Sequence, residues 1–281
     1  MIFVLLFFAA LGLLICALML VRLRDWRMDH AEWLRLAALQ PANPTRFDPA
    51  MVADLPEPAQ RFFKFAIAPG TPLLPVAEID MGGEFSLGTR DAPNYRRMEA
   101  RQILAAPHGF VWRMRLPGWL SMSGSDAGSE SESWTRFSIL GLIPAARMGK
   151  DADHLRSAYG RCVGEAVFWT PAALLPGPGV TWERIDQNTA RVTVAVGALS
   201  QAVDITLNAD GQPITVVLMR WSNANLEKEY RLQPFGGTLS DFREVRGYRL
   251  PFRVEAGNMF GTDEYFAFYV AEVADIRFPA V

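Results

Sequence analysis

The chain has 281 residues, of which 50% are hydrophobic, and its 28 basic and 30 acidic side chains give a formal net charge of −2. This balance provides no basic surface of the kind that nucleic acids need, so nucleic acid is not expected as a partner. The two cysteines are Cys16, in a strongly apolar stretch, and Cys162, so the rest of the chain cannot form an internal disulfide. Length and apolar content suffice for one large domain with its own core.

The N-terminal segment predicts a membrane anchor. Ile2 to Val21 carry no charged side chain, and at about 1.5 Å of rise per residue such a helix spans a hydrocarbon core roughly 30 Å thick. A cleavable signal peptide is the alternative, but the run lacks a basic start and ends in Arg22 and Arg24. We therefore expect residues 1–23 to form an uncleaved, single-pass membrane anchor. The arginines that follow the run favour a cytoplasmic position for the body.

Residues 24–70 predict a helical collar beside the membrane. Asp25 to Gln40 have an amphipathic pattern that continues the anchor helix, and Trp26 and Trp33 suit the headgroup region. Several prolines then interrupt the chain. Glu57 to Ala66 predict a second short helix, whose aromatic side should lie against the main body.

Residues 71–281 predict a mainly β, α+β domain, because apolar and polar residues now alternate with a period of two. Tight turns such as Asn208 to Gly211 and Arg246-Gly247 join consecutive strands, which makes an antiparallel meander. Ser121 to Ser133 are rich in serine and glycine and are expected to form a polar loop or a frayed edge strand. The expected strands are Val76–Leu87, Tyr95–Leu104, Gly109–Leu116, Thr181–Ile185, Ala190–Val196, Ala202–Leu207, Pro213–Trp221, Tyr230–Gln233, Gly237–Val245, Tyr248–Ala256 and Glu264–Phe278.

One helix is expected between the two groups of strands, over residues 151–169. It places an apolar stripe at spacings of three and four residues, and Thr170-Pro171 ends it. A curved antiparallel sheet has one face to bury, so this stripe should pack on the concave side of the sheet. The stripe consists of Leu155, Tyr159, Cys162, Ala166 and Trp169.

The sequence offers few residues for metal or cofactor chemistry. Its three histidines stand alone, without a His or Cys at a metal-ligand spacing: His30, His108 and His154. Asp126, Glu130 and Glu132 gather acidic oxygens as a weak calcium site would, but without the ordered spacing of an EF-hand, so a solvated loop is the favoured interpretation. No phosphate-binding glycine loop is present either. We expect no metal and no cofactor.

The central helix carries the most specific cluster of polar residues. His154, Arg161 and Glu165 fall within about 40° of one another around the helix axis, and Arg161 can pair with Glu165 four residues on. This cluster is either a structural ion pair or a partly buried pair that orients a polar headgroup at the mouth of a cavity. Trp112, Trp169 and Trp182 could line the apolar part of such a cavity, or belong to the core.

Several strings together resemble an uncharacterised bacterial family, domain-of-unknown-function family 6544. They are Leu55 to Phe63, Gly109 to Trp112, Leu140 to Pro144, Arg161 with Glu165, Trp169 to Leu175, Gly179 to Trp182, and Asp241 to Pro251 leading to Glu255 and Tyr265. The resemblance implies a fold similar to the half-barrel of periplasmic lipoprotein carriers. In such a fold the sheet and the helix would enclose an apolar cavity beside the bilayer. The resemblance also implies that the anchor lies in the bacterial inner (plasma) membrane and that the body is periplasmic, in contrast to what the arginines favour.

Three functional hypotheses follow. The first is a non-enzymatic, membrane-anchored binder of a lipid or another hydrophobic molecule. The second is an enzyme on a hydrophobic substrate, with Glu165 or Asp126 as acid or base and His154 nearby. The third is a structural module that holds a protein partner through residues 40–70. The candidate ligand-binding residues are Trp112, Asp126, His154, Arg161, Glu165, Trp169, Trp182, Glu255 and Tyr265.

Overall fold

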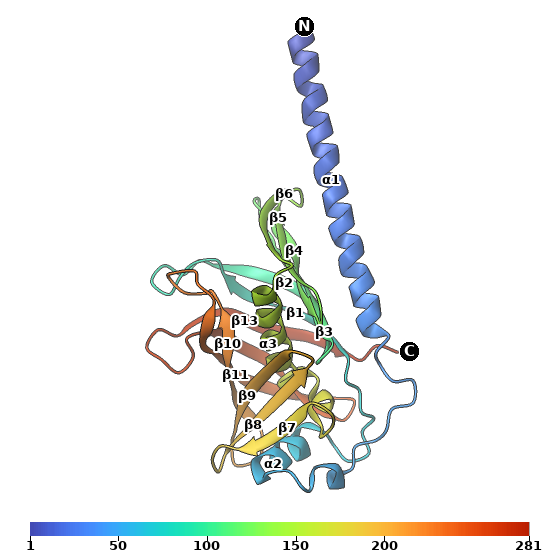
Figure 1. The fold of residues 1–281 in the computed structure, drawn as a ribbon, viewed down its shortest axis with the longest axis vertical. Helices are drawn as coiled ribbons and strands as arrows, with labels where there is room; N and C mark the ends of the chain where they lie inside the picture. Colours follow the sequence, from blue (N-terminus) through green and yellow to red (C-terminus); the bar gives the residue numbers. More distant parts are fainter. Residues whose placement is uncertain (281) are drawn as a thin grey trace.

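The computed structural model describes residues 1–280, and its most prominent element is the N-terminal helix α1 (Ile2–Ala37). The helix is unbroken, and its first twenty or so residues project from the body with their side chains exposed (Figure 1). By length and composition it is a candidate membrane span or signal sequence. The amphipathic segment does continue the apolar helix, as expected, so the boundary predicted after residue 23 falls within one continuous helix.

The last third of α1 packs against the outer, convex face of the sheet. Trp33 and Leu36 are buried there in an apolar cluster of their own, beside Ile103, Val111 and Trp134. The expected position of Trp33 in the headgroup region is therefore wrong: its indole N–H donates to Glu78 Oε1 at 2.8 Å. Trp26, in contrast, is exposed.

Between α1 and the sheet lie a short 3₁₀ helix, η1 (Pro49–Val52), and helix α2 (Glu57–Ala66). Asp48 caps η1, with its carboxylate accepting a hydrogen bond from Ala50 N at 2.9 Å. α2 buries Phe62 and Phe63 in the main core, so its aromatic side faces the body as the sequence predicts.

The body is one curved antiparallel sheet, in which each strand pairs with its neighbours without parallel contacts among the described residues. The order is β6-β5-β4-β3-β2-β1-β13-β12-β11-β10-β9-β8-β7, so β1 and β13 join the two halves of the chain at the centre. The fold class expected from the sequence is confirmed: a mainly β protein with a long apolar N-terminal helix and a curved meander over one central helix. The strands are β1 (Ala77–Ser86), β2 (Tyr95–Ala105), β3 (Gly109–Leu116), β4 (Met122–Ser129), β5 (Ser133–Ile139), β6 (Ile143–Gly149), β7 (Val180–Arg184), β8 (Thr189–Val196), β9 (Leu199–Leu207), β10 (Pro213–Ser222), β11 (Arg231–Val245), β12 (Tyr248–Asn258) and β13 (Phe266–Arg277).

The serine-rich segment differs from its prediction. It forms strand β4, which pairs along its length with β3 and, on its other edge, with β5. β5 and β6 were not expected as strands, and β11 is one long strand where two short ones were expected. The serines of β4 have partners on the convex side: Ser125 Oγ donates to Asp29 Oδ1 of α1 at 2.9 Å. Polar strand residues are thus matched to polar residues of α1, which a search for apolar alternation cannot detect.

Helix α3 (Ala152–Trp169) lies on the concave side of the sheet, and the short helix η2 (Pro171–Leu174) follows it. Asp151 caps α3 by accepting a hydrogen bond from His154 N at 2.8 Å. Because the sheet curves around it, α3 is buried on most of its circumference, including the stripe residues Tyr159, Cys162, Ala166 and Trp169. The main core therefore lies between α3 and the concave face.

Candidate functional site

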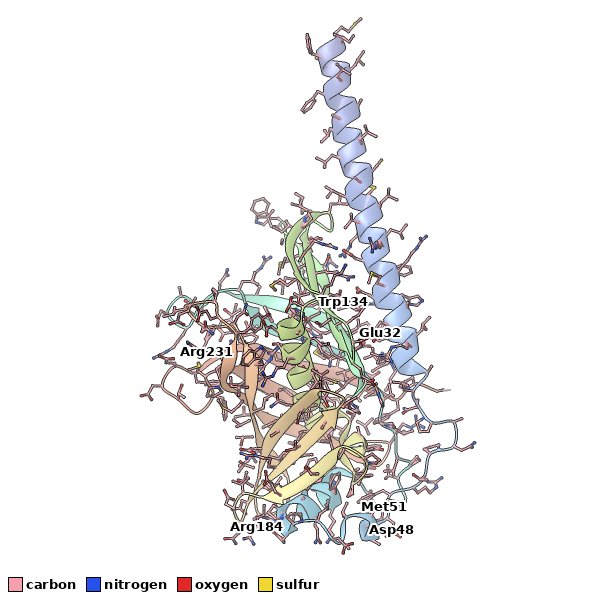
Figure 2. All side chains as sticks on the ribbon, viewed as in Figure 1. Glu32, Asp48, Met51, Trp134, Arg184 and Arg231 are labelled. Carbon is pink, nitrogen blue, oxygen red and sulfur yellow. The ribbon has the colours of Figure 1, made fainter. Side chains whose placement is uncertain are left out.

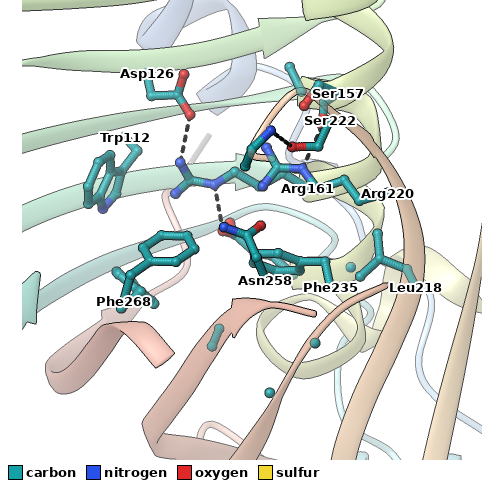
Figure 3. Close-up of a pocket in the computed structure, with 18 of the residues that line it drawn as sticks. Trp112, Asp126, Ser157, Arg161, Leu218, Arg220, Ser222, Phe235, Asn258 and Phe268 are labelled. Atoms are coloured by element: carbon teal, nitrogen blue, oxygen red, sulfur yellow. Dashed lines mark hydrogen bonds and ion pairs between the residues drawn. The ribbon is translucent and has the colours of Figure 1, made fainter. Parts of the chain in front are cut away.

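A cavity of about 320 Å³ lies between α3 and the concave face of the sheet. Its walls are largely apolar and come from strands on both halves of the sheet as well as from the helix (Figure 3). The apolar lining residues are Phe85, Trp112, Phe137, Met148, Ala158, Phe168, Trp169, Val216, Leu218, Phe235, Leu239, Val254, Ala256, Phe268 and Tyr269. The period-two pattern of the strands and the crossing of α3 bring these side chains together, and the volume falls in the range of about 300–1,000 Å³ typical of ligand sites.

Arg161 of α3 organises the polar part of the cavity. Its Nε donates to Glu165 Oε1 at 2.7 Å, and its Nη1 donates to Asp126 Oδ2 of β4 at 2.7 Å. The guanidinium also stacks over Trp112, 4.8 Å from the ring centroid. Burial lowers the pKa of Arg161, but the charges of Glu165 and Asp126 outweigh burial, so the pKa stands above its usual value.

Every carboxylate oxygen of Asp126 and Glu165 accepts a hydrogen bond. The remaining oxygen of Asp126 accepts from Thr135 Oγ1 at 2.5 Å, and the remaining oxygen of Glu165 accepts from Gln102 Nε2. The cluster is therefore internally satisfied, with two carboxylates around one cation, Arg161.

Arg220 of β10 is a second cation in the same cavity. Its Nε donates to Ser157 O of α3 at 3.3 Å, and its guanidinium lies 5.1 Å from the ring centroid of Phe235. Arg220 takes part in none of the ion pairs found among residues 1–280, although Asp126 and Glu165 act on it from a distance. Burial and the nearby charge of Arg161 lower the pKa of Arg220. Figure 3 shows the two arginines side by side in the cavity, with Phe235 and Phe268 beside them.

Two buried indole groups also reach the cavity wall without a partner. Trp112 is 3% exposed and Trp169 is fully buried, and both line the cavity. Neither indole N–H has a hydrogen-bond partner within residues 1–280. A buried donor left unpaired costs about 1–3 kcal/mol, so both groups are energetically costly features of the core around the cavity.

His154, in contrast, has protein partners on both ring nitrogens. Nδ1 lies 2.8 Å from Ser133 Oγ, and Nε2 lies 3.0 Å from Thr135 Oγ1. These contacts tie the first turn of α3 to β5. Cys162 is buried, and burial raises the pKa of its thiol, which favours the unreactive protonated form.

The structure brings six of the nine candidate residues to the cavity: Trp112, Asp126, His154, Arg161, Glu165 and Trp169. The other three lie elsewhere. Trp182 is half-buried and packs against the core residues Phe62 and Phe63 of α2. Glu255 lies on β12 between the cavity-lining Val254 and Ala256, so the alternation of the strand turns it outward, where it pairs with Arg253 at 2.7 Å. Tyr265 packs on Phe260 in the β12–β13 turn.

Asp126 also lies in a different setting from the one expected. It is not part of a flexible acidic loop, because it lies on β4, which has a neighbouring strand on each side, and pairs with Arg161. Glu130 pairs with His108 instead, with 2.5 Å between Oε1 and Nδ1. The described residues contain no group of three or more acidic, histidine or cysteine side chains that could hold a metal ion.

Sequence reasoning missed the cavity residues of the second half of the sheet, above all Arg220. A signal for it exists in the sequence. On β10 every second residue faces the same side of the sheet. The alternation that turns Val216 and Leu218 inward therefore also turns Arg220 inward. A basic residue at an inward position of a strand is a candidate site residue.

The fold and the cavity define a curved-sheet protein with a partly polar, otherwise apolar binding site. The chain belongs to the family of unknown function DUF6544, whose model matches residues 45–270, and the resemblance drawn from the sequence is thereby confirmed. No curated protein matches the sequence.

Two of the solved structures that are similar to this chain are the following. One is a LolA superfamily protein from Nitrosomonas europaea, with 10% identity, a TM-score of 0.45, and coverage of 80% of this chain and 93% of that chain. The other is a putative outer membrane lipoprotein-sorting protein domain from Vibrio parahaemolyticus, with 10% identity, a TM-score of 0.36, and coverage of 72% of this chain and 85% of that chain.

Proposed function

We propose that the protein is a membrane-anchored, non-enzymatic binding protein of the bacterial envelope, which holds an amphiphile with an apolar chain and an anionic headgroup. The observation that carries this proposal is Arg220, a half-buried cation without an ion-pair partner among residues 1–280, beside an apolar cavity of about 320 Å³. Residues 1–23 would serve as a single-pass anchor and keep the cavity beside the bilayer.

The apolar lining supports a hydrocarbon chain as the bound group. Each methylene that leaves water for such a wall contributes about 0.8 kcal/mol, so a chain of several methylenes supplies most of the binding free energy. The aromatic residues Phe235, Phe268 and Trp112 give the wall a large apolar area.

The charges support an anionic rather than a cationic headgroup. Arg161 is matched by two carboxylates within hydrogen-bonding distance, whereas Arg220 has none, so an added anion would complete the pairing of Arg220. Recognition by Arg220 would add a charge-assisted hydrogen bond worth about 1.5–3 kcal/mol.

The hydrogen bonding of the carboxylates favours binding over acid–base catalysis. A general acid or base needs a carboxylate that can exchange a proton with a substrate. Both oxygens of Asp126 and both of Glu165 are already engaged by Arg161, Thr135 and Gln102. These residues therefore act as the frame that holds Arg161 in place.

A titration with matched probes tests the proposal. A dansyl-labelled fatty acid and the corresponding dansyl-labelled alcohol are titrated into the full chain in detergent micelles, with Arg220→Gln as the variant. We expect about 10- to 100-fold weaker binding of the acid, because 1.5–3 kcal/mol corresponds to one to two powers of ten, and little change for the alcohol.

Arg184→Gln is the matched control, since Arg184 is exposed and lies at the end of the molecule away from the N-terminus (Figure 2). Its affinities should equal those of the wild type. Equal binding of the acid and the alcohol by wild type and Arg220→Gln would contradict the role of Arg220. Absence of binding of either probe would contradict the proposed function.

A further inference from the structure

Large apolar side chains are exposed at one end of the sheet, on the turns that join β3 to β4 and β5 to β6. Trp119 is 88% exposed, Leu120 41%, Leu140 52% and Ile143 54%. The two turns are neighbours, because Met122 pairs with Ile139 and Leu140 N donates to Ser121 O at 2.8 Å. We refer to Trp119, Leu120, Leu140 and Ile143 together as the apolar tip. A cluster of large apolar side chains exposed in this way marks a site that contacts another protein or a membrane.

The apolar tip is held at a fixed height along α1 by a series of polar contacts. Arg22 Nη2 donates to Ser123 Oγ at 3.1 Å, directly beside the tip. Further along the helix, Asp25 accepts two hydrogen bonds from Arg147 of β6, at 2.6 and 2.9 Å. Asp29 accepts from Trp134 Nε1 at 3.0 Å, and Figure 2 shows Trp134 on the side of the sheet that faces α1. Hydrogen bonds therefore join each of the strands β4 to β6 to α1.

These contacts place the apolar tip at the end of the apolar run of α1. Arg22 is the first charged residue after the run from Ile2 to Val21. Leu18, one turn earlier on the same face of the helix, is half-buried, whereas the residues before it are exposed. In Figure 1 the β5–β6 hairpin accordingly rises beside the middle of α1. Since α1 continues without a break, the tip must lie where the helix leaves a bilayer.

We propose that the apolar tip inserts into the lipid bilayer beside α1 and forms a second membrane contact of the protein. This inference rests on α1 as a membrane span, and is independent of what the cavity holds. The bilayer is the occupant that continues the apolar surface of α1 without interruption. A helix alone would leave the body free to tilt, whereas a helix and a tip together fix its orientation at the membrane.

The charges next to the apolar tip match this position. Arg22 and Arg24 follow the apolar run on α1, and Arg115 of β3 lies opposite Ser123, exposed on the side of the sheet toward Arg22. Basic side chains at this height meet the phosphates of the headgroups, and each contributes favourably near an anionic leaflet. Along α1, the apolar tip, the arginines and the body follow one another in the same order as the hydrocarbon core, the headgroups and the water of a bilayer.

The consequence for the cavity is a short path from the bilayer. On β5 the inward-facing Ile139 lies next to the tip. Phe137, two residues earlier in the chain, also faces inward and lines the cavity. Met148 of β6 lines the same part of the cavity and is exposed. A lipid chain could therefore pass from the leaflet to the cavity along an apolar surface.

Site-specific fluorescence in proteoliposomes tests this inference. The full chain with Cys16→Ser, in which Cys162 is buried and does not react, carries a nitrobenzoxadiazole label at Leu120→Cys or at Leu140→Cys. The control is Ile185→Cys, which is 45% exposed and follows Arg184 at the far end of the molecule. The vesicles consist of phosphatidylcholine and phosphatidylglycerol, with a phosphatidylcholine that carries a doxyl spin label on its acyl chain near the headgroup.

We expect the doxyl lipid to remove most of the emission of labels at positions 120 and 140, and aqueous iodide to leave it largely unchanged. The label at position 185 should behave in the opposite way. Iodide quenching at positions 120 and 140 equal to that at 185 would overturn the inference. Protection from both quenchers would also overturn it, because a protein partner would then cover the tip. Neither outcome bears on whether the cavity binds an amphiphile.

Discussion

Removal of Arg161 should destabilise the protein strongly, because this side chain is the cation shared by two partly buried carboxylates. The side chains of Arg161, Asp126 and Glu165 are 14%, 18% and 14% exposed. In Arg161→Met the aliphatic part of the side chain is kept, while two short ion pairs and the stacking on Trp112 and Phe110 are lost. The two carboxylates would then face each other without a cation.

The expected loss follows from this geometry. Breaking a buried ion pair typically costs about 3–5 kcal/mol, mainly because the remaining charge is left uncompensated. Since the three side chains keep some exposure, we expect a value near the lower end, about 3 kcal/mol. The triple variant with Asp126→Asn, Arg161→Met and Glu165→Gln removes all three charges, and should recover stability to within about 1 kcal/mol of the wild type.

Urea unfolding of the full chain in dodecylmaltoside micelles, followed by circular dichroism of the sheet, measures both differences. Arg231→Met is the control, because Arg231 pairs with Glu227 at the surface and its side chain is 53% exposed, so its loss should cost well under 1 kcal/mol. A cost below about 1 kcal/mol for Arg161→Met would refute the reasoning. A triple variant as unstable as Arg161→Met would show that packing of the arginine, not charge, is what matters.

Two further predictions concern Asp29 of α1 and Tyr248 of β12. Burial raises the pKa of Asp29 above its usual value of 3.8. At neutral pH the ionised carboxylate therefore lowers the free energy of unfolding. This destabilisation disappears as the pH falls through the raised pKa toward 3.8. Asp29→Asn should therefore gain most stability relative to the wild type at neutral pH and progressively less in acid, as measured by urea midpoints across the acid range. Tyr248→Phe should lose about 1–3 kcal/mol, because the Tyr248 hydroxyl accepts from the buried Leu74 N–H at 2.8 Å; an unchanged urea midpoint would contradict this.

Much of the fold could be predicted because apolar periodicity carries the information. The stripe of α3 and the alternation of the longer strands each reflect burial against one neighbour, and burial of apolar area is what the periodicity encodes. β4 could not be found in this way, since its convex side chains, Ser123 and Ser125, are matched by Arg22 and Asp29 from about a hundred residues earlier in the chain. Such long-range polar pairing leaves no local pattern.

The candidate site was predictable on the helix and not on the second half of the sheet. Arg161 and Glu165 are recognisable as a pair because four residues on a helix bring side chains together. The approach of Arg220 to this pair depends on the curvature of the sheet, which brings β10 to the other side of α3. The prediction that Glu255 lines the site was wrong for a related reason. Its strand was expected, but which side of the sheet Glu255 faces depends on the register of β12 with β11 and β13.

The central claim is that the cavity beside Arg220 holds an amphiphile, and filling the cavity tests it most directly. Gly164 of α3 lines the cavity, and a Cβ there would meet only Leu218, at 3.4 Å, so a larger side chain at this position would project into the cavity. Gly164→Leu also raises helix propensity by roughly 1 kcal/mol, so the helix itself is not weakened. Native mass spectrometry of the full chain, extracted from membranes in mild detergent, should show one bound lipid on the wild type and none on Gly164→Leu. A wild type without bound lipid, or a Gly164→Leu variant that keeps it, would contradict the claim.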